Sequence, residues 1–177
     1  MKLGTEYSTV RVGDIAPDFT LPTDAGEPLT LSSLRGKRVV LFFYPKDSSP
    51  GCTIEACGFR DLVPRFKRRG VAVLGIAPGT VRSKARFKAA QGLNFPLLND
   101  AEQQAAEAYG VWREKLLFGH RYMGVMRTTY VIGTDGRVEA VWEHVEHEGH
   151  ATEVDAFLRG APPPVRASQV GRAAKKK

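Results

Sequence analysis

The chain has 177 residues, a formal net charge of +7 and 42% hydrophobic residues. This length suits one domain with its own core and is short for two, and the composition is that of an ordinary globular protein. No apolar run reaches the roughly 18 residues of a membrane-spanning helix. The first residues contain no apolar stretch of the secretory kind, so we expect a cytoplasmic protein that does not associate with a membrane.

Much of the positive charge lies in residues 161–177, a segment that begins with Ala and three prolines and contains five basic and no acidic side chains. A basic tail can attract nucleic acid or a membrane surface. Aromatic residues do not interleave with these charges, however, so we predict a solvated, disordered tail without a nucleic-acid partner. Residues 1–160 are then expected to form the folded domain.

The first half of this domain begins with residues 10–37, which are rich in Gly, Pro, Asp and Thr and predict short extended pieces joined by turns. Arg38–Tyr44 is a continuous apolar run, typical of a strand buried on both faces. A helix is predicted from about Pro50 to Arg69. Pro64 lies inside it and should kink or break it, because proline lacks the N–H and clashes with the preceding turn.

The second half alternates between strand and helix patterns. The predicted elements are a buried strand at 71–77, a helix at 80–92 closed by a glycine, a short strand at 95–100, a helix at 101–110, a hairpin at 127–142 around a Thr-Asp-Gly turn, and a helix at 150–160. This order predicts an α/β domain with a mixed sheet, in which crossovers join parallel strands and the hairpin adds antiparallel ones.

The two cysteines of the chain, Cys52 and Cys57, both lie near the start of the predicted helix. Ser49 stands at the N-cap position and Pro50 at the first helical position, which is a favourable helix start. Cys52 therefore lies in the first turn, where unpaired N–H groups and the helix dipole favour an anion, and a thiolate is the nucleophilic form of cysteine. Cys57 lies further along, so the two thiols should be chemically unequal.

The spacing of the cysteines limits how they can bond. Five helical residues give an axial rise of about 7.5 Å and a rotation of about 140°, which places the two Cα atoms roughly 8.6 Å apart. A disulfide requires Cα atoms within about 7 Å. Cys52 and Cys57 therefore cannot bond while the helix is intact, and a disulfide between them would require its first turns to unwind.

Other uses of these side chains are less favoured. The helix start argues against two inert thiols, and zinc would need four ligands that this pair cannot supply. His144, His147 and His150 have a spacing that could bind metal on a helix, but Gly149 interrupts it, so we predict a polar surface segment. We expect neither a metal nor a cofactor.

The segment FYPKDSSPGCTIEAC, residues 43–57, resembles the active site of the peroxiredoxins, and most closely the subgroup called bacterioferritin comigratory protein or peroxiredoxin Q. Further segments resemble the family in the same order: VGDIAPDFTLP, LSSLRGKRVVLFFYPKD, GFRD, NFPLLND, YGVW and RTTYVI. The resemblance implies a thioredoxin fold, with a central mixed sheet flanked by helices and an N-terminal extension. It also implies a thiol-specific peroxidase for hydrogen peroxide and organic hydroperoxides, active in antioxidant defence and redox homeostasis.

The resemblance implies a role for each residue of the site. Cys52 is the peroxidatic cysteine, which becomes a sulfenic acid, and Cys57 is the resolving cysteine, which forms an intrachain disulfide that a thioredoxin-like dithiol reduces. Arg127 would stabilise the thiolate and hold the peroxide, Ser49 would bridge sulfur and peroxide, and Pro45 would limit water. Members that resolve within one chain need no second subunit, so we expect a monomer.

The chain departs from the usual family pattern at three places. Ser49 replaces threonine, Gly133 replaces aspartate, and the basic tail beyond Gly160 is additional. Two alternatives stay open: a thiol–disulfide oxidoreductase or redox-sensing protein on the same fold, and a binding module that uses the basic tail on nucleic acid.

Overall fold

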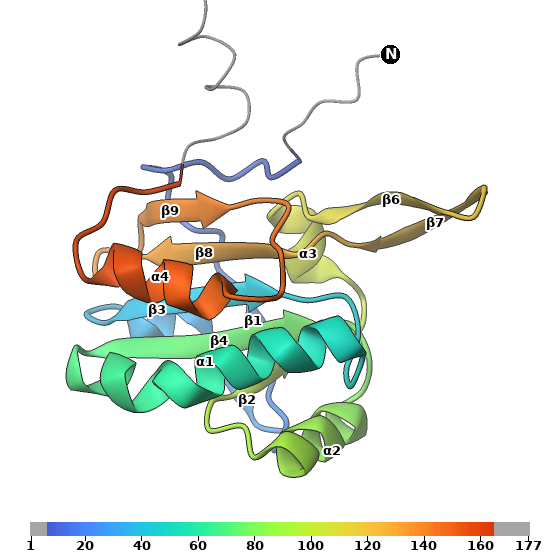
Figure 1. Cartoon of the computed structure of the whole chain (residues 1–177), viewed down its shortest axis with the longest axis horizontal. Helices are drawn as coiled ribbons and strands as arrows, with labels where there is room; N and C mark the ends of the chain where they lie inside the picture. The colour runs from blue at the N-terminus through green and yellow to red at the C-terminus, as the bar shows by residue number, and fades with distance from the viewer. Residues whose placement is uncertain (1–6, 165–177) are drawn as a thin grey trace, which may run out of the picture.

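A five-stranded mixed sheet forms the centre of the computed structural model, which describes residues 7–164 (Figure 1). Its strands are β3 (Arg38–Phe43), β4 (Val71–Ala77), β5 (Leu97–Asn99), β8 (Thr128–Ile132) and β9 (Val138–Trp142). They are arranged in the order β5-β4-β3-β8-β9. The first three run parallel, whereas β8 is antiparallel to both of its neighbours. The predicted mixed sheet and the hairpin that closes it are confirmed.

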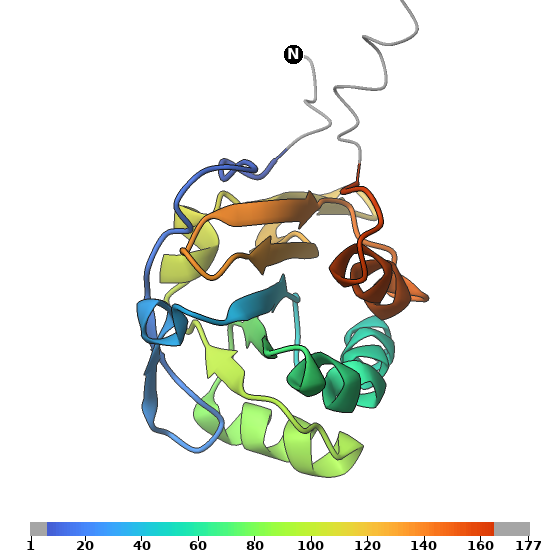
Figure 2. The same cartoon turned by 90° about the vertical axis from the view of Figure 1, so that its left-hand side faces the viewer.

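Each face of the sheet has its own apolar core. One face packs against three helices, which lie on the same side of the sheet in Figure 2: α1 (Pro50–Arg68), α2 (Val81–Gln91) and α4 (His150–Leu158). The other face packs against α3 (Gln104–Ala108), β1 (Thr20–Pro22), β2 (Pro28–Thr30) and the 3-10 helix η1 (Leu31–Leu34). Val40 and Phe42 of β3 enter the first core, and Leu41 and Phe43 enter the second. The prediction that this strand is buried on both faces is therefore confirmed.

Helix α1 is continuous through Pro64, so the expected break is wrong, while the kink that was expected as the alternative stays a prediction. Proline cannot donate to the carbonyl of Arg60, four residues earlier. That carbonyl instead accepts a hydrogen bond of 3.2 Å from the side-chain Nδ2 of Asn94. Val63 and Phe66, on either side of the proline, are buried in the core of the first face. A partner outside the helix and apolar packing thus compensate for the lost backbone bond.

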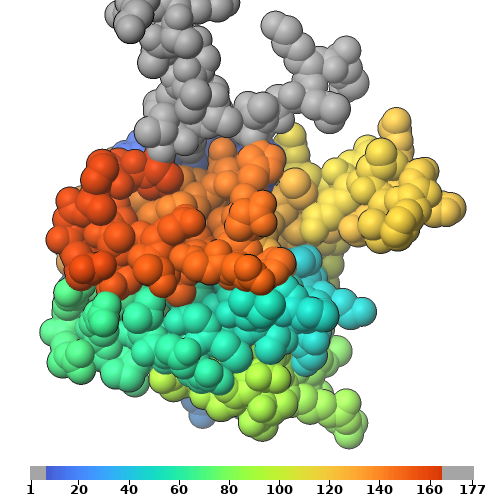
Figure 3. All heavy atoms as spheres, in the orientation of Figure 1, coloured from blue at the N-terminus to red at the C-terminus, as the bar shows by residue number. Residues whose placement is uncertain are grey.

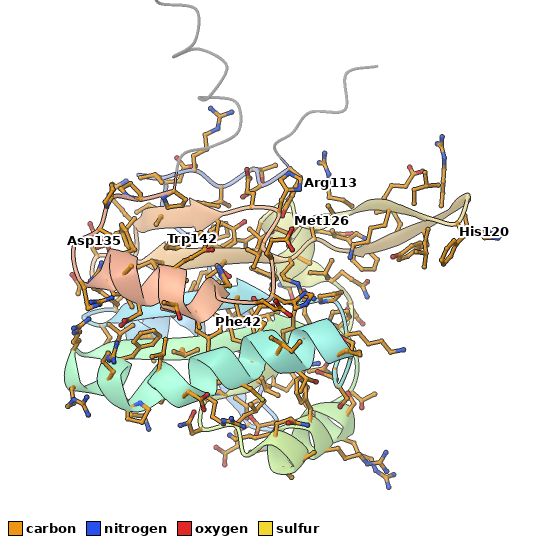
Figure 4. The ribbon with its side chains drawn as sticks, in the orientation of Figure 1. Phe42, Arg113, His120, Met126, Asp135 and Trp142 are labelled. Atoms are coloured by element: carbon orange, nitrogen blue, oxygen red, sulfur yellow. The ribbon has the colours of Figure 1, made fainter. Side chains whose placement is uncertain are left out.

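An antiparallel ribbon, which the sequence did not predict, stands outside the central sheet. It consists of β6 (Trp112–Leu117) and β7 (His120–Val125) and projects from the body at the end where α1 begins (Figures 1 and 3). Figure 4 shows His120 at its tip. Phe118 and Gly119 make the turn, both with positive φ, of 49° and 77°. An aromatic residue is rare in that conformation, so the usual sequence signal of a tight hairpin was missing.

The other predicted helices are present with adjusted ends. Helix α2 ends at Gln91, and its C-cap Gly92 has a left-handed φ of 59°, as the closing glycine predicted. Helix α3 is shorter than the predicted 101–110. Residues 165–177, most of the predicted disordered tail, lie outside the described residues. Within residues 7–164, no helix is both long and apolar enough to cross a membrane.

Candidate active site

Cys52 occupies the first turn of α1, as predicted from the helix start. Ser49 is the N-cap and has extended backbone angles, with Pro50 directly after it. The Ser49 hydroxyl donates to the carbonyl of Lys46 at 3.1 Å and does not cap the helix. The Ser49 carbonyl accepts bonds from the backbone N–H and the hydroxyl of Thr53. The first N–H groups of α1 therefore have no side-chain cap and can stabilise negative charge beside Cys52.

The sulfur of Cys52 is held against Arg127, which lies far away in the sequence. Cys52 is only 1% exposed, and Arg127 Nη2 donates to its Sγ at 3.3 Å. Arg127 directly precedes β8, so the pairing of β8 with β3 carries it to the end of the sheet where α1 begins. The structure thus brings together two of the predicted site residues, with a guanidinium that donates to the sulfur.

Glu55 is a site residue that the sequence did not reveal. Its carboxylate is buried and forms an ion pair with Arg127 Nη1, while its other oxygen, Oε1, has no hydrogen-bond partner among the described residues. Burial raises the pKa of Glu55 to about 7, although Arg127 acts in the opposite direction. Its position three residues after Cys52, on the same face of α1, is the signal that could have identified it.

Arg127 is the charged centre of this cluster. Burial lowers the pKa of its guanidinium, but Glu55 and Cys52 raise it more, so the net direction is upward. Lys115 of the ribbon is a second basic group near this cluster. Burial and then Arg127 lower its pKa, while Cys52 acts in the opposite direction. The site is therefore a partly dry, positively charged environment around one thiol, which suits a thiolate nucleophile.

Cys57 has different surroundings on the same helix. It is half-buried, and its thiol donates to Gln91 Oε1 of α2 at 3.6 Å. Arg60 Nη1 lies 3.4 Å from the sulfur and also donates to the Gln91 carbonyl. Both cysteines are free thiols in an unbroken helix, as the spacing predicted. The two sulfurs therefore meet different partners, one beside β8 and the other beside α2.

The AhpC/TSA family matches residues 12–141 of the chain. The chain belongs to this family. It is 49% identical to a putative peroxiredoxin Bcp of Coxiella burnetii, over 82% of this chain and 97% of the relative. It is 42% identical to peroxiredoxin Bcp of Escherichia coli K12, over 85% of this chain and 96% of the relative. The predicted resemblance is confirmed, and the chain is a peroxiredoxin, a thiol-dependent peroxidase.

Solved structures agree with this assignment. The bacterioferritin comigratory protein of Xanthomonas campestris, studied for its alkyl peroxide reduction, has a TM-score of 0.78 and 34% identity over 86% of this chain and 97% of that one. A cysteine variant of peroxiredoxin Q from Xylella fastidiosa has a TM-score of 0.81 and 33% identity, with the same coverage of 86% and 97%. The thioredoxin fold implied by the sequence is therefore confirmed.

Two histidines of the predicted polar segment, His147 and His150, lie near helix α1 and strand β8 of the peroxiredoxin. A Cβ atom on Gly51 would lie 3.1 Å from His147 Nδ1 and 3.4 Å from Arg127 Nη2, so the glycine allows both groups to approach the first turn of α1. His150 is fully buried and bonds through Nε2 to the Thr129 hydroxyl at 2.7 Å. Burial lowers its pKa to about 4. The prediction of a surface segment is therefore wrong for His150, whose ring packs against Phe59 of α1 and Trp142 of β9.

Pro45 and Ser49 lie half-buried in the loop that connects β3 to α1, ahead of Cys52. In the resting structure the Ser49 hydroxyl is bonded to the Lys46 carbonyl. Among residues 7–164, no group of three or more His, Cys, Asp or Glu side chains is arranged to hold a metal ion.

Proposed function

We propose that Cys52 is the peroxidatic residue of this peroxiredoxin. Its thiolate attacks the terminal oxygen of a hydroperoxide, an S–O bond forms, and the O–O bond breaks. The displaced alkoxide or hydroxide takes up a proton and leaves as an alcohol or water. The 3.3 Å contact between Arg127 Nη2 and the buried Cys52 Sγ, at an uncapped helix N-terminus, is the observation that carries this assignment. Donors fixed in advance stabilise the charge that moves from sulfur to oxygen.

Cys57 is proposed as the resolving residue. Its thiolate attacks the sulfenic acid of Cys52, an S–S bond forms, the S–O bond breaks, and the hydroxide takes up a proton and leaves as water. The helix keeps the two Cα atoms roughly 8.6 Å apart, so its first turns must unwind before this step. A thioredoxin-type dithiol then reduces the disulfide. The half-buried position of Cys57, separate from the Cys52 pocket, supports this division of roles.

The proposal extends to the remaining predicted features. The Ser49 hydroxyl turns from the Lys46 carbonyl to the bound peroxide, and Pro45 shields the sulfur from water. Hydrogen peroxide and organic hydroperoxides are both substrates. Because both cysteines lie in one chain, a monomer is sufficient for the cycle. The cycle needs a dithiol reductant, and such reductants are present in the reducing cytoplasm. Residues 1–160 are the catalytic domain, and the basic residues 161–177, of which 165–177 lie outside the described residues, are dispensable for the reaction.

The test compares the two cysteines. Cys52→Ser abolishes peroxide consumption, whereas Cys57→Ser consumes one equivalent of peroxide at the normal rate and then stops with thioredoxin as reductant. Mass analysis without reduction, after one equivalent of peroxide, should show an intrachain Cys52–Cys57 disulfide in the wild type. A Cys52→Ser variant with full activity, or a wild type without this disulfide, would contradict the proposal.

A truncation tests the tail. Deleting residues 161–177 should leave peroxidase activity unchanged and should not alter DNA binding at low salt. A loss of salt-dependent DNA binding in the truncated chain would instead give the tail a nucleic-acid partner.

A further inference from the structure

Asp47 joins the active-site loop to another helix through a buried polar cluster. It lies between β3 and α1, two residues before Ser49. Its Oδ1 accepts a hydrogen bond of 2.6 Å from the Tyr44 hydroxyl. Its Oδ2 accepts bonds from the Ser83 hydroxyl at 2.6 Å and from Lys84 Nζ at 3.1 Å, both on α2. One carboxylate therefore ties the end of β3, the loop and the start of α2 together.

The ion pair in this cluster is unusually well buried. The side chain of Lys84 is fully buried, and that of Asp47 is only 8% exposed. Lys84 Nζ also donates to the Pro78 carbonyl at 3.1 Å, so the ammonium has two oxygen partners. Replacing a buried ion pair with apolar groups is often neutral for stability, because desolvation offsets the Coulomb attraction. Stability alone is therefore a weak explanation for a lysine at this position.

The backbone around Asp47 also shows that the loop is constrained. Ser48 has a φ of 63°, which is uncommon for a residue other than glycine. Such a conformation persists where surrounding contacts determine it. Gly79, on the facing segment, leaves room for the carboxylate, because a Cβ atom there would lie 3.0 Å from Asp47 Oδ2. The two segments approach closely, and the carboxylate fills the space between them.

The hydrogen bonds and the ion pair of the cluster are separate from those that hold the first turn of α1. The first turn is held by Arg127 on Cys52 and Glu55, and by the bonds from Thr53 to the Ser49 carbonyl. None of these involves Asp47, and none involves α2. The first turn can therefore open while the cluster around Asp47 stays intact.

We propose that Asp47 and Lys84 are positioning residues that fix the loop of residues 45–49, so that unwinding of α1 begins after Ser49. The fixed loop places Cys52 against Arg127 for the peroxide step and provides the stationary end from which the first turns unwind. This inference rests on the proposed Cys52–Cys57 cycle. Without the cluster, Cys52 is less well placed for peroxide, and its segment moves towards Cys57 more freely.

Two double variants test this proposal without leaving one buried charge unpaired. Asp47→Ala/Lys84→Met removes the whole connection, and Asp47→Asn/Lys84→Met keeps an amide that can still bond to Tyr44 and Ser83. Rapid quenching with a thiol-blocking reagent gives the rate constants for Cys52 oxidation and for disulfide formation. We expect the alanine variant to oxidise about tenfold more slowly and to form the disulfide faster, with the asparagine variant between it and the wild type.

The deciding quantity is the ratio of the disulfide-forming rate constant to the peroxide rate constant, because loss of folded protein lowers both rates together. An increased ratio, with less overoxidised Cys52 at high peroxide, supports the proposal. The control Arg38→Met/Glu139→Gln removes a 2.7 Å ion pair on β3 and β9 and should keep the wild-type ratio. An unchanged ratio in both Asp47 variants overturns the inference, while failure of the wild type to form the disulfide overturns the proposed cycle instead.

Discussion

The two ends of helix α1 are held by different kinds of contact. Its first turns depend on polar partners: Arg127 donates to Cys52 and pairs with Glu55, and no side chain caps the helix. Its later turns bury Phe59 and Phe66 completely in the core between helix and sheet. Redox chemistry changes the charge on sulfur and so weakens the first set of contacts, but it leaves the second unaffected. Unwinding should therefore stop where the apolar packing begins.

The same contrast separates the two cysteines. The side chain of Arg127, beside Cys52, is 15% exposed and pairs with a fully buried carboxylate. The side chain of Arg60, beside Cys57, is 34% exposed and pairs with Asp61, which is 67% exposed. An ion pair away from water is screened much less than one at the surface. Similar arginine–sulfur distances should therefore have unequal chemical consequences.

The largest expected effect is on stability, from the apolar end of the helix. Phe59→Ala should lower the free energy of unfolding by about 3–5 kcal/mol, because it leaves a cavity against Phe42 and His150. Ile54→Ala, at a side chain that is 44% exposed on the same helix, should cost less than about 1 kcal/mol. Urea unfolding measures both. If both variants lost the same free energy of unfolding, apolar packing would not distinguish the two ends of α1.

The second effect concerns the peroxide step. Arg127→Gln should slow Cys52 oxidation by about 10²–10³-fold, the usual consequence of removing one fixed donor from developing charge. Arg60→Gln should change this rate by less than about fivefold, since its pair is partly exposed. Stopped-flow oxidation of the reduced protein by hydrogen peroxide compares the variants. If the two arginines prove equivalent, the buried cluster has no special role in the reaction.

The third effect is a pH dependence from Glu55. Its pKa is about 7 in the folded protein and about 4.5 in the unfolded chain, so the folded state binds this proton more tightly. Its contribution to stability is therefore fully present below pH 4.5 and is lost as the pH rises to about 7. That change corresponds to about 3 kcal/mol. Urea unfolding between pH 4.5 and 8 should show the wild type losing stability relative to Glu55→Gln by about this amount. A constant difference between the two proteins would contradict the assignment.

The sequence predicted those features that are determined by residues close together in the chain. Cys52 was identified because Ser49 and Pro50, its near neighbours, mark a helix start. Strands β3 and β4 were identified because each is a continuous apolar run, and the β8–β9 hairpin because of its Thr-Asp-Gly turn. Glu55 was missed because its role depends on Arg127, which lies 72 residues away. The β6–β7 ribbon was missed because its strands are mostly exposed and its turn carries a phenylalanine.

Pro64 shows how a contact from a distant part of the chain can override a prediction made from local sequence. Its effect on the helix was predicted from local geometry alone, which requires the carbonyl of Arg60 to lose its partner. The structure supplies Asn94 Nδ2 as a replacement from a loop 34 residues away. No local pattern encodes that contact, so a break, one of the two outcomes expected from the chain around Pro64, does not occur.

The smallest expected effect tests this replacement. Asn94→Ala should lower the free energy of unfolding by about 1 kcal/mol, because the Arg60 carbonyl loses its donor and the site is partly solvated. In a Pro64→Ala background, residue 64 regains its N–H and bonds to that carbonyl, so Asn94→Ala should cost clearly less. Urea unfolding of the four proteins gives the coupling between the two positions. Equal costs in both backgrounds would show that Asn94 does not compensate for the proline, and the continuity of α1 would then rest on the packing of Val63 and Phe66 alone.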